Sequence, residues 1–369
     1  MANDEKLGLR FLLVTFFLLL AVMLIATLYP FDFCPPNDVK WLSNKPGLYF
    51  NGHGIAYTNR GKSIHKTKAV SVELWLKERV GSKNWGPREI FSFYDGSASP
   101  SLLVGQWGGR IFLYSRFEKN EGDKWYRLFR TKYRFPVGKP HLVTVTFGGD
   151  EKAIYIDGKL DDKRRTETHD TANVEFSGRL ILGNSPTIKN GWWGEIKGLA
   201  IYNRVLLPKE IITHSTEVFQ KGMRGLTEMP GCIALYPFEE GEGNRAESIV
   251  GASRRFCIPA SRTALAATVF NLPHMDMRIE HLPVVDFLNN IIFFFPFSIL
   301  FSVIILRKYS VGYFVTFLVV TFAGGLLSLA IEFLQLFLHT RTSGIADVLA
   351  NMTGSGLGVL VSYSLKLKR

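Results

Sequence analysis

The stretch His141-Leu-Val-Thr-Val-Thr-Phe-Gly-Gly-Asp-Glu-Lys-Ala-Ile-Tyr-Ile-Asp-Gly-Lys159 decides the fold of the middle of the chain. It contains two runs of alternating residues, 141–147 and 153–156, separated by a glycine-rich break. A period of two places neighbouring side chains on opposite faces, which is typical of a β-strand. Asp157-Gly158 is a hairpin turn signal. This part of the chain is therefore predicted to be β-structure.

Similar runs occur on both sides of this stretch. Val70, Val72, Leu74 and Leu76 alternate with more polar residues, which indicates a strand with two different faces. Further short runs are Ile90–Tyr94, Leu102–Val104, Arg110–Phe117, Arg179–Leu182 and Glu195–Tyr202. Many short strands with glycine-rich breaks predict an all-β sandwich or barrel. One helix is expected to start near Pro208, with Ile211, Ile212 and Val218 facing the sandwich.

The composition excludes several classes of protein. The 369 residues are 47% apolar and 21% charged, with a net charge of +12 and only 3 Cys. This is too hydrophobic for disorder and too charged for membrane spans alone. Collagen, coiled coil and a disulfide-dense scaffold are excluded as well.

Four apolar segments are long enough to cross a bilayer, which takes about 20 residues in a helix. They are 11–28, about 284–306, 311–338 and 344–365. A cleaved signal peptide is an alternative for the first, since Lys6 and Arg10 precede it. The uncleaved anchor is favoured, because the apolar core is long and no small-residue cleavage site follows it.

The basic residues near the spans predict their orientation, because short loops rich in Lys and Arg stay in the cytoplasm. With four spans, three basic segments fall on one side: the N-terminus, the loop with Arg307 and Lys308, and the C-terminus. The β-rich segment, about 36–264, then lies outside the cytoplasm, followed by a linker over 265–283. We expect a multi-pass protein of the plasma (inner) membrane.

The strand motifs resemble the concanavalin A-like lectin/glucanase domains of the LamG type. The segment 141–159 is similar to that family's central hairpin, 194–211 to its closing strands and helix, and Val72–Leu76 to an early strand. The family usually has Ser where Leu207 stands, so the capping box is lost here. Ala234–Gly243 resembles the strand that usually opens the domain, and here it is expected to complete a jelly-roll sandwich from the C-terminal side.

The resemblance implies binding of carbohydrate or protein. Enzymatic relatives use Glu-x-Asp-x-Glu on one strand face, and no such motif occurs in this chain, which argues against a glycosidase. Candidates for stacking on sugar rings are Trp107, Trp125, Trp192 and Trp193, although such residues often only pack. The residues Asp150, Asp157, Asp161 and Asp162 are candidates for a Ca²⁺ site, and the alternative is that they are solvated turn residues.

The three cysteines all lie on the proposed outer side, where disulfides persist. Cys232 and Cys257 are the expected pair, which leaves Cys34 unpaired. Their spacing makes no recognisable metal site.

A polar stripe marks the last spans. Polar residues recur at steps of three and four, which places them on one helical face. We expect a pocket open to the outside, and the alternative is a network that only clamps the helices. Its residues are Asp286, Asn290, Glu332, Gln335, Arg341, Asp347 and Asn351, with Gly325, Gly354 and Gly358 allowing close helix packing.

These motifs resemble the VanZ-like family. The resemblance is carried by Glu332-Phe-Leu-Gln335, Arg341 and Ala346–Asn351. The segment from Asp286 through Phe297 and the first span, which ends at Tyr29-Pro30-Phe31, resemble the family as well. The fold implied is an all-α four-helix bundle into which the sandwich is inserted. The family is named for a protein that lowers sensitivity to the glycopeptide teicoplanin, which does not by itself imply resistance here.

Two functions remain open at this point. One is a cell-envelope protein of the bacterial type, whose lectin-like sandwich binds surface glycan, peptidoglycan or an envelope protein. The other is a membrane enzyme acting on lipid-linked or cell-wall glycan through the acidic pocket. A transporter is disfavoured, because no inverted repeat is visible. Nucleic acid is disfavoured as a partner, because the positive balance lies outside the cytoplasm, and no P-loop or dinucleotide fingerprint occurs.

Overall fold

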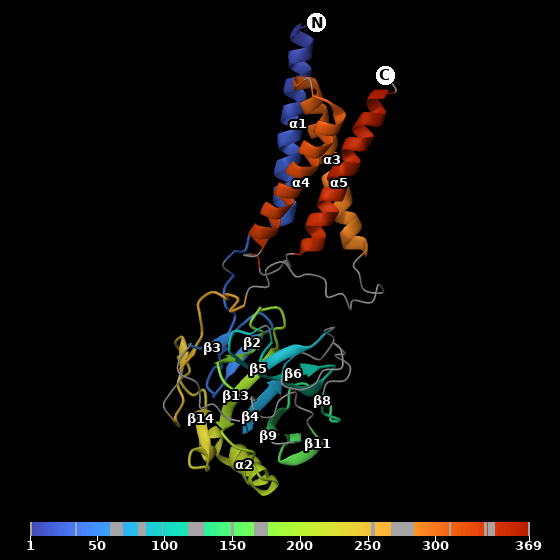
Figure 1. Ribbon diagram of the computed structural model, residues 1–369. Coiled ribbons are helices and arrows are strands. Elements are labelled where there is room, and N and C mark those ends of the chain that lie inside the picture. Colours follow the sequence, from blue (N-terminus) through green and yellow to red (C-terminus); the bar gives the residue numbers. More distant parts are fainter. Residues whose placement is uncertain are drawn as a thin grey trace. The chain divides into compact units, whose positions relative to one another are not determined.

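A computed structural model describes residues 2–33, 35–59, 69–79, 86–97, 99–116, 129–148, 151–165, 176–251, 255–266, 284–309, 311–335, 338 and 344–367. The chain divides into two compact units (Figure 1). One consists of residues 1–33 and 267–369, and the other of residues 34–266. Each unit is described by itself.

The first unit is helical. Its helices are α1 (Ala2–Leu28), α3 (Val284–Lys308), α4 (Tyr313–Gln335) and α5 (Ile345–Leu367). Each of the four contains a stretch long and apolar enough to cross a membrane, so the four predicted apolar helices are confirmed. Helix α5 packs against α3 and α4, and α1 packs against the same two helices.

The second unit is a sandwich of two antiparallel sheets, as predicted. We call them sheet I and sheet II. Sheet I has the strand order β1 (Lys40–Trp41), β2 (Leu48–Asn51), β13 (Trp193–Tyr202), β4 (Ala69–Glu78), β9 (Pro140–Gly148), β10 (Glu151–Ile156) and β11 (Lys159–Arg165), with β14 (Cys232–Tyr236) on β13. Sheet II has the order β15 (Arg245–Ala246), β16 (Phe256–Cys257), β3 (Ala56–Thr58), β12 (Arg179–Leu182), β5 (Arg88–Tyr94), β6 (Leu102–Trp107), β7 (Arg110–Tyr114) and β8 (Phe129–Arg130).

The core between the sheets follows from the period-two pattern. Val70, Val72, Leu74 and Leu76 of β4 all point into it and are at most 2% exposed. Sheet II contributes Phe91, Phe93 and Val104 from its own alternating positions, among others. Burial of these side chains away from water is the main force that holds the two sheets together.

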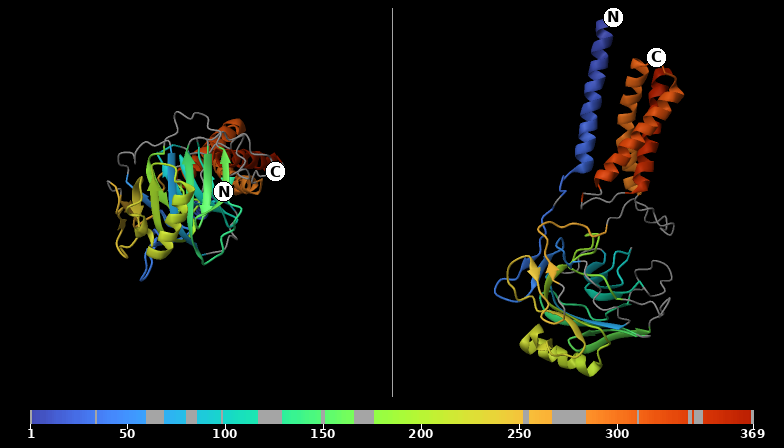
Figure 2. Two further views of the ribbon diagram at one scale, coloured as in Figure 1. Left: turned by 90° about the horizontal axis from the view of Figure 1, so that it is seen from below. Right: turned by 60° about the vertical axis from the view of Figure 1, so that its left-hand side comes forward.

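The other face of β4 is buried as well, because α2 (Pro208–Lys221) lies across sheet I (Figure 2). Glu73 is fully buried on this face. Its carboxylate accepts hydrogen bonds from Thr144 Oγ1 (3.1 Å) and Tyr202 OH (2.9 Å), and it lies 3.0 Å from His214 Nδ1 of α2. A buried charge is tolerated only with such partners, so this network ties the helix to the sheet.

The start of α2 keeps half of a capping box. Leu207 has no side-chain acceptor, in agreement with the sequence analysis, but Glu210 Oε2 still accepts the Leu207 backbone N–H at 2.7 Å. Arg204 binds the same carboxylate at 2.7 and 2.8 Å and lowers the pKa of Glu210 to about 2. The missing serine is therefore replaced in part by the Arg204–Glu210 ion pair.

The late strand β14 completes sheet I from the C-terminal side, as predicted. The first half of β13 pairs with β2 through Trp193–Ile196. Its second half pairs with β14, with Leu199 opposite Tyr236. Both partners lie on the edge of β13 that β4 does not occupy.

Candidate functional sites

The tryptophans proposed for sugar stacking have different environments. Trp192 is 2% exposed and belongs to the core, so the stacking prediction is wrong for this residue. Its Nε1 donates a hydrogen bond to Gln106 Oε1 at 2.6 Å, and Gln106 Nε2 donates to Glu78 Oε2 at 2.8 Å. Trp192 therefore anchors a polar link between the two sheets. Trp125 lies outside the described residues.

Trp193 is half-buried, but its ring already has internal contacts. The Arg88 guanidinium lies 4.9 Å from the ring centroid. The backbone of Gly52 lies so close that a Cβ atom on it would come within 2.1 Å of the ring. These contacts leave little of the ring for a ligand.

Trp107 is the candidate whose ring has no aromatic or cation–π partner among the described residues. It is half-buried near the end of β6. Gly105, two residues earlier, points to the same outer face of sheet II, about 7 Å along the strand. Glu89 lies opposite Gly105, and Arg110 lies opposite Trp107. Glu89 and Arg110 therefore share a face with Trp107.

The polar groups on this face have few hydrogen-bond partners among the described residues. Glu89 is 8% exposed, and its Oε2 has no hydrogen-bond partner among the described residues. Asn190 Nδ2 donates to the other oxygen at 3.2 Å. Burial raises the pKa of Glu89 to about 7. Arg110 Nε is also buried without a partner in the described part. We call Trp107, Glu89, Arg110 and Asn190 the Trp107 site.

Sequence reasoning missed Glu89, Arg110 and Asn190. Glu89 precedes an ordinary apolar strand run, and nothing in its neighbours distinguishes it from a surface acid. Its special environment arises because residues 190 and 191 run beside β5, with Glu89 N–H donating to Asn190 O at 2.8 Å. Only the fold brings these groups together.

The acids proposed for calcium are each bound to other partners. Asp157 accepts the Leu142 N–H at 2.9 Å and lies 2.7 Å from His141 Nδ1. Asp161 accepts the backbone N–H groups of residues 132 and 133 at 2.6 and 3.0 Å. Asp162 lies 3.3 Å from the Lys132 ammonium. The described residues contain no group of three or more His, Cys, Asp or Glu side chains suited to a metal, and Asp150 lies outside them.

The proposed Cys232–Cys257 disulfide is contradicted, because both cysteines are free. Cys232 lies in β14 of sheet I, and its Sγ contacts the Ala234 carbonyl oxygen at 3.6 Å. Cys257 lies in β16 of sheet II, opposite Tyr57 of β3. The two strands belong to different sheets, and neither cysteine forms a disulfide bond. Cys34 lies outside the described residues.

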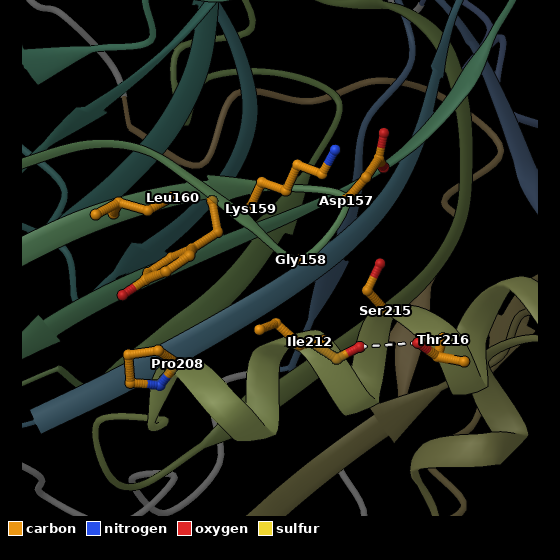
Figure 3. A pocket seen from close by; sticks show the side chains of 9 residues that line it. Asp157, Gly158, Lys159, Leu160, Pro208, Ile212, Ser215 and Thr216 are labelled. Carbon is orange, nitrogen blue, oxygen red and sulfur yellow. Dashed lines mark hydrogen bonds between the residues drawn. The ribbon is translucent and has the colours of Figure 1, made fainter.

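A groove of about 480 Å³ lies between the β10–β11 hairpin and α2 (Figure 3). Figure 3 shows Ile212 and Pro208 of α2 on one side and Leu160 of the hairpin on the other. Ile212 is 56% exposed, so the prediction that it faces the sandwich is wrong, whereas Ile211 and Val218 are buried. Ser215, close to Gly158, gives the groove a polar end.

The polar residues of the spans form hydrogen bonds between helices. Asn290 Nδ2 of α3 donates to Asp347 Oδ1 of α5 at 2.7 Å. Glu332 of α4 is 4% exposed, and its Oε2 accepts the Gly344 N–H at 2.9 Å. Gln335 Nε2 donates to the Thr27 carbonyl oxygen of α1 at 3.1 Å.

Asn351 also belongs to this network. It is 5% exposed, and its Nδ2 donates to Ser328 Oγ at 2.8 Å. Its Oδ1 is buried without a partner among the described residues. Five of the seven predicted pocket residues thus form hydrogen bonds between helices or at the start of a helix: Asn290, Glu332, Gln335, Asp347 and Asn351. Arg341 and the side chain of Asp286 lie outside the described part.

The three glycines mark close helix contacts. A Cβ atom on Gly354 would come within 2.3 Å of the Ile291 carbonyl oxygen, and one on Gly358 within 2.3 Å of Ser298 Oγ. Both contacts are with α3. Gly325 of α4 packs against Met352 of α5, whose side chain would lie 3.0 Å from a Cβ atom added to the glycine. Small residues at these points let the helix backbones approach each other.

Fold and sites together define a membrane protein with a lectin-type β-sandwich. Residues 50–212 match the family model of the concanavalin A-like lectin/glucanases superfamily. Residues 232–366 match the VanZ/LLP1 family model, which begins in β14, before the spans. The chain therefore combines a concanavalin A-like domain with a VanZ-like membrane region.

Three solved structures illustrate what the sandwich is similar to. A candidate carbohydrate-binding protein from Bacteroides ovatus is 10% identical, with a TM-score of 0.41. The match covers 60% of this chain and 61% of that protein, so this chain spans less than two thirds of its length. A heptameric SAP-like pentraxin from Limulus polyphemus is 13% identical, with a TM-score of 0.35, over 49% and 80%. The binding domain of botulinum neurotoxin serotype C1 is 17% identical, with a TM-score of 0.37, over 49% and 45%. No curated protein matches the sequence.

Proposed function

We propose that the sandwich is a glycan-binding module, which the VanZ-like helices hold on the outer side of the plasma membrane. The observation that carries this proposal is the Trp107 site. A half-exposed indole, with no aromatic or cation–π contact among the described residues, lies on one sheet face with a carboxylate oxygen, Glu89 Oε2, and a guanidinium nitrogen, Arg110 Nε, that are buried and lack partners there. The family match of residues 50–212 supports the same function.

The chemistry of the site suits a sugar. The apolar C–H face of a pyranose packs on an aromatic ring, and its hydroxyls donate to and accept from planar polar side chains. Glu89 Oε2 is an acceptor when ionised and a donor when protonated. Arg110 Nε supplies a donor. The hydroxyl groups of a neutral or an acidic sugar would satisfy Glu89 Oε2 and Arg110 Nε at once.

The outer location rests on the basic residues around the spans. Arg307 and Lys308 end α3, and short loops rich in Lys and Arg favour the cytoplasm. With four spans, the segments before the first span and after the last would lie on that same side. The sandwich, between α1 and α3 in sequence, is then exported. There it would meet surface glycan, peptidoglycan or an envelope protein.

A glycan array probed with the purified full-length protein in detergent tests the proposal. We expect binding to a defined set of glycans, and loss of that binding in Trp107→Ala. Phe219→Ala is the matched control, because Phe219 is an aromatic residue of α2 that is 49% exposed. Equal binding by Trp107→Ala and the wild type would contradict the Trp107 site, and an empty array would contradict glycan binding.

The alternative of a membrane enzyme rests on Glu332 and Asp347. Each has a structural partner, Gly344 N–H and Asn290 Nδ2 respectively. The geometry therefore favours a network that clamps the helices, with the binding function in the sandwich.

A further inference from the structure

A cluster of cations lies on the outer face of sheet I, the sheet opposite the Trp107 site. It surrounds Glu195, which is fully buried. One carboxylate oxygen, Oε1, accepts a hydrogen bond from Arg79 Nε at 2.6 Å and lies 3.7 Å from Lys45 Nζ and 3.9 Å from Lys77 Nζ. Three cations therefore share one oxygen atom.

A fourth cation joins them from the same strand as Glu195. The Lys197 ammonium lies 4.8 Å from the centroid of the Trp75 ring. Burial lowers the pKa of Lys197, and the nearby charges of Lys45 and Lys77 lower it further, against the opposite effect of Glu195. We call Lys45, Lys77, Arg79 and Lys197 the basic patch.

The basic patch carries more positive charge than its carboxylate can neutralise. Four cations face one acid, and Glu195 is the one acid among the charged groups that shift the pKa of Lys197. Like charges at this distance repel each other, and partial burial weakens the screening by water. The Lys45 and Arg79 side chains are 41% and 45% exposed, so a ligand can reach them.

A second, independent observation indicates a missing acceptor. Trp75 Nε1 is buried and has no hydrogen-bond partner among the described residues. An indole N–H is only a donor and normally finds an acceptor when buried. The patch thus places ammonium groups beside one N–H donor that lacks an acceptor among the described residues, while Glu195 Oε2 is likewise buried there without a partner.

We propose that the basic patch binds an anionic phosphate group. Phosphate presents several oxygen acceptors on one compact anion, and lysine ammonium groups bind it as point charges. The Glu195 carboxylate holds the charged groups of Lys45, Lys77 and Arg79 close to one another. The phosphate can belong to a soluble phosphoester or to a lipid headgroup. The proposal is independent of the Trp107 site, because the two lie on different sheets.

The first arm of the test measures soluble ligands. Isothermal titration calorimetry of the full-length protein in nonionic detergent uses inorganic phosphate, glycerol phosphate and sulfate. We expect saturable binding of a phosphate compound, weakened about tenfold in Lys45→Gln/Lys197→Gln, since two charge-assisted contacts are lost. Lys209→Gln/Lys221→Gln on α2 removes the same charge elsewhere and is expected to bind like the wild type.

The second arm distinguishes the source of the phosphate. The protein in phosphatidylcholine nanodiscs is mixed with vesicles that contain phosphatidylglycerol, or phosphatidylcholine alone, and the vesicles are floated. The site binds a lipid headgroup if the protein floats with phosphatidylglycerol vesicles, if this flotation requires Lys45 and Lys197, and if soluble phosphate does not bind. Binding of glycerol phosphate assigns it to a soluble phosphoester.

Glu195→Gln keeps the shape of the side chain and removes its charge. We expect tighter phosphate binding by this variant, because the anion no longer competes with a carboxylate for the same cations. Phosphate should also raise its melting temperature more than that of the wild type. The proposal is overturned if neither arm shows binding, if sulfate binds as well as phosphate, or if the two double variants bind alike.

Discussion

Glu332 of α4 accepts the backbone N–H of Gly344, the residue before α5, at 2.9 Å. Gly344 has no side chain to cap the helix that follows, and the first N–H groups of a helix lack internal partners. A carboxylate at this end also interacts favourably with the helix dipole. Glu332, which the sequence analysis assigned to a pocket, therefore links the end of α4 to the start of α5.

Removing this cap should destabilise the helical unit. We expect Glu332→Ala to lower the melting temperature of the full-length protein in detergent, with a loss of about 1–2 kcal/mol, as for other helix caps. Glu332→Gln keeps an acceptor oxygen and should lose much less. Leu329→Ala is the control, because Leu329 is 44% exposed on the same helix. Equal losses in the Gln and Ala variants would show that the charge, rather than the hydrogen bond, matters.

Close packing of α5 on α3 predicts a strong effect of one methyl group. In Gly354→Ala the new Cβ atom would come within 2.3 Å of the Ile291 carbonyl oxygen, so the helices must separate. We expect a loss of about 1–3 kcal/mol, the usual cost of overpacking, measured as a lower melting temperature. Gly312→Ala meets no atom within 4 Å and should be neutral. A neutral Gly354→Ala would mean that the two helices are not in contact at this point.

The raised pKa of Glu89 predicts a dependence of stability on pH. In the folded protein this pKa is about 7, against 4.5 for an ordinary Glu side chain. Between these values the folded state binds more protons than the unfolded state, so stability is fully present below pH 4.5 and is lost as the pH rises through 7. The size of the effect is on the order of 3 kcal/mol.

Glu89→Gln isolates this contribution. The amide does not titrate, so the difference in melting temperature between wild type and Glu89→Gln should change between pH 4.5 and 7 and stay constant below that range. A difference that does not vary with pH would indicate that Glu89 ionises like a surface residue.

The sequence predicted the longer elements of the fold but not the short strands β1, β2, β3, β8, β15 and β16. Alternation in 70–76 and 141–147 predicted strands at those places, and the apolar runs predicted the four helices. It did not reveal that the polar face of β4 is also buried. Glu73 looks like a solvent-facing residue of an alternating strand until α2, more than 130 residues later, covers it.

The sites were harder to predict, because their residues meet only in three dimensions. Trp107, Trp192 and Trp193 are indistinguishable in the sequence, yet one is in the core and another is covered by Arg88. Glu195 and Lys77 lie opposite each other on neighbouring strands, a register that no local pattern specifies. The membrane stripe was visible, since helical periodicity is local, but its partners across helices were not.

The side of the membrane on which the sandwich lies is the central claim, and site-specific labelling tests it most directly. In a chain whose three native cysteines are replaced by serine, Lys209→Cys on the exposed side of α2 and Lys308→Cys at the end of α3 are treated with a membrane-impermeant maleimide on intact cells. We predict that Lys209→Cys is labelled at once and that Lys308→Cys is labelled only after the cells are permeabilised. Labelling of Lys308→Cys alone in intact cells would contradict an exported glycan-binding domain.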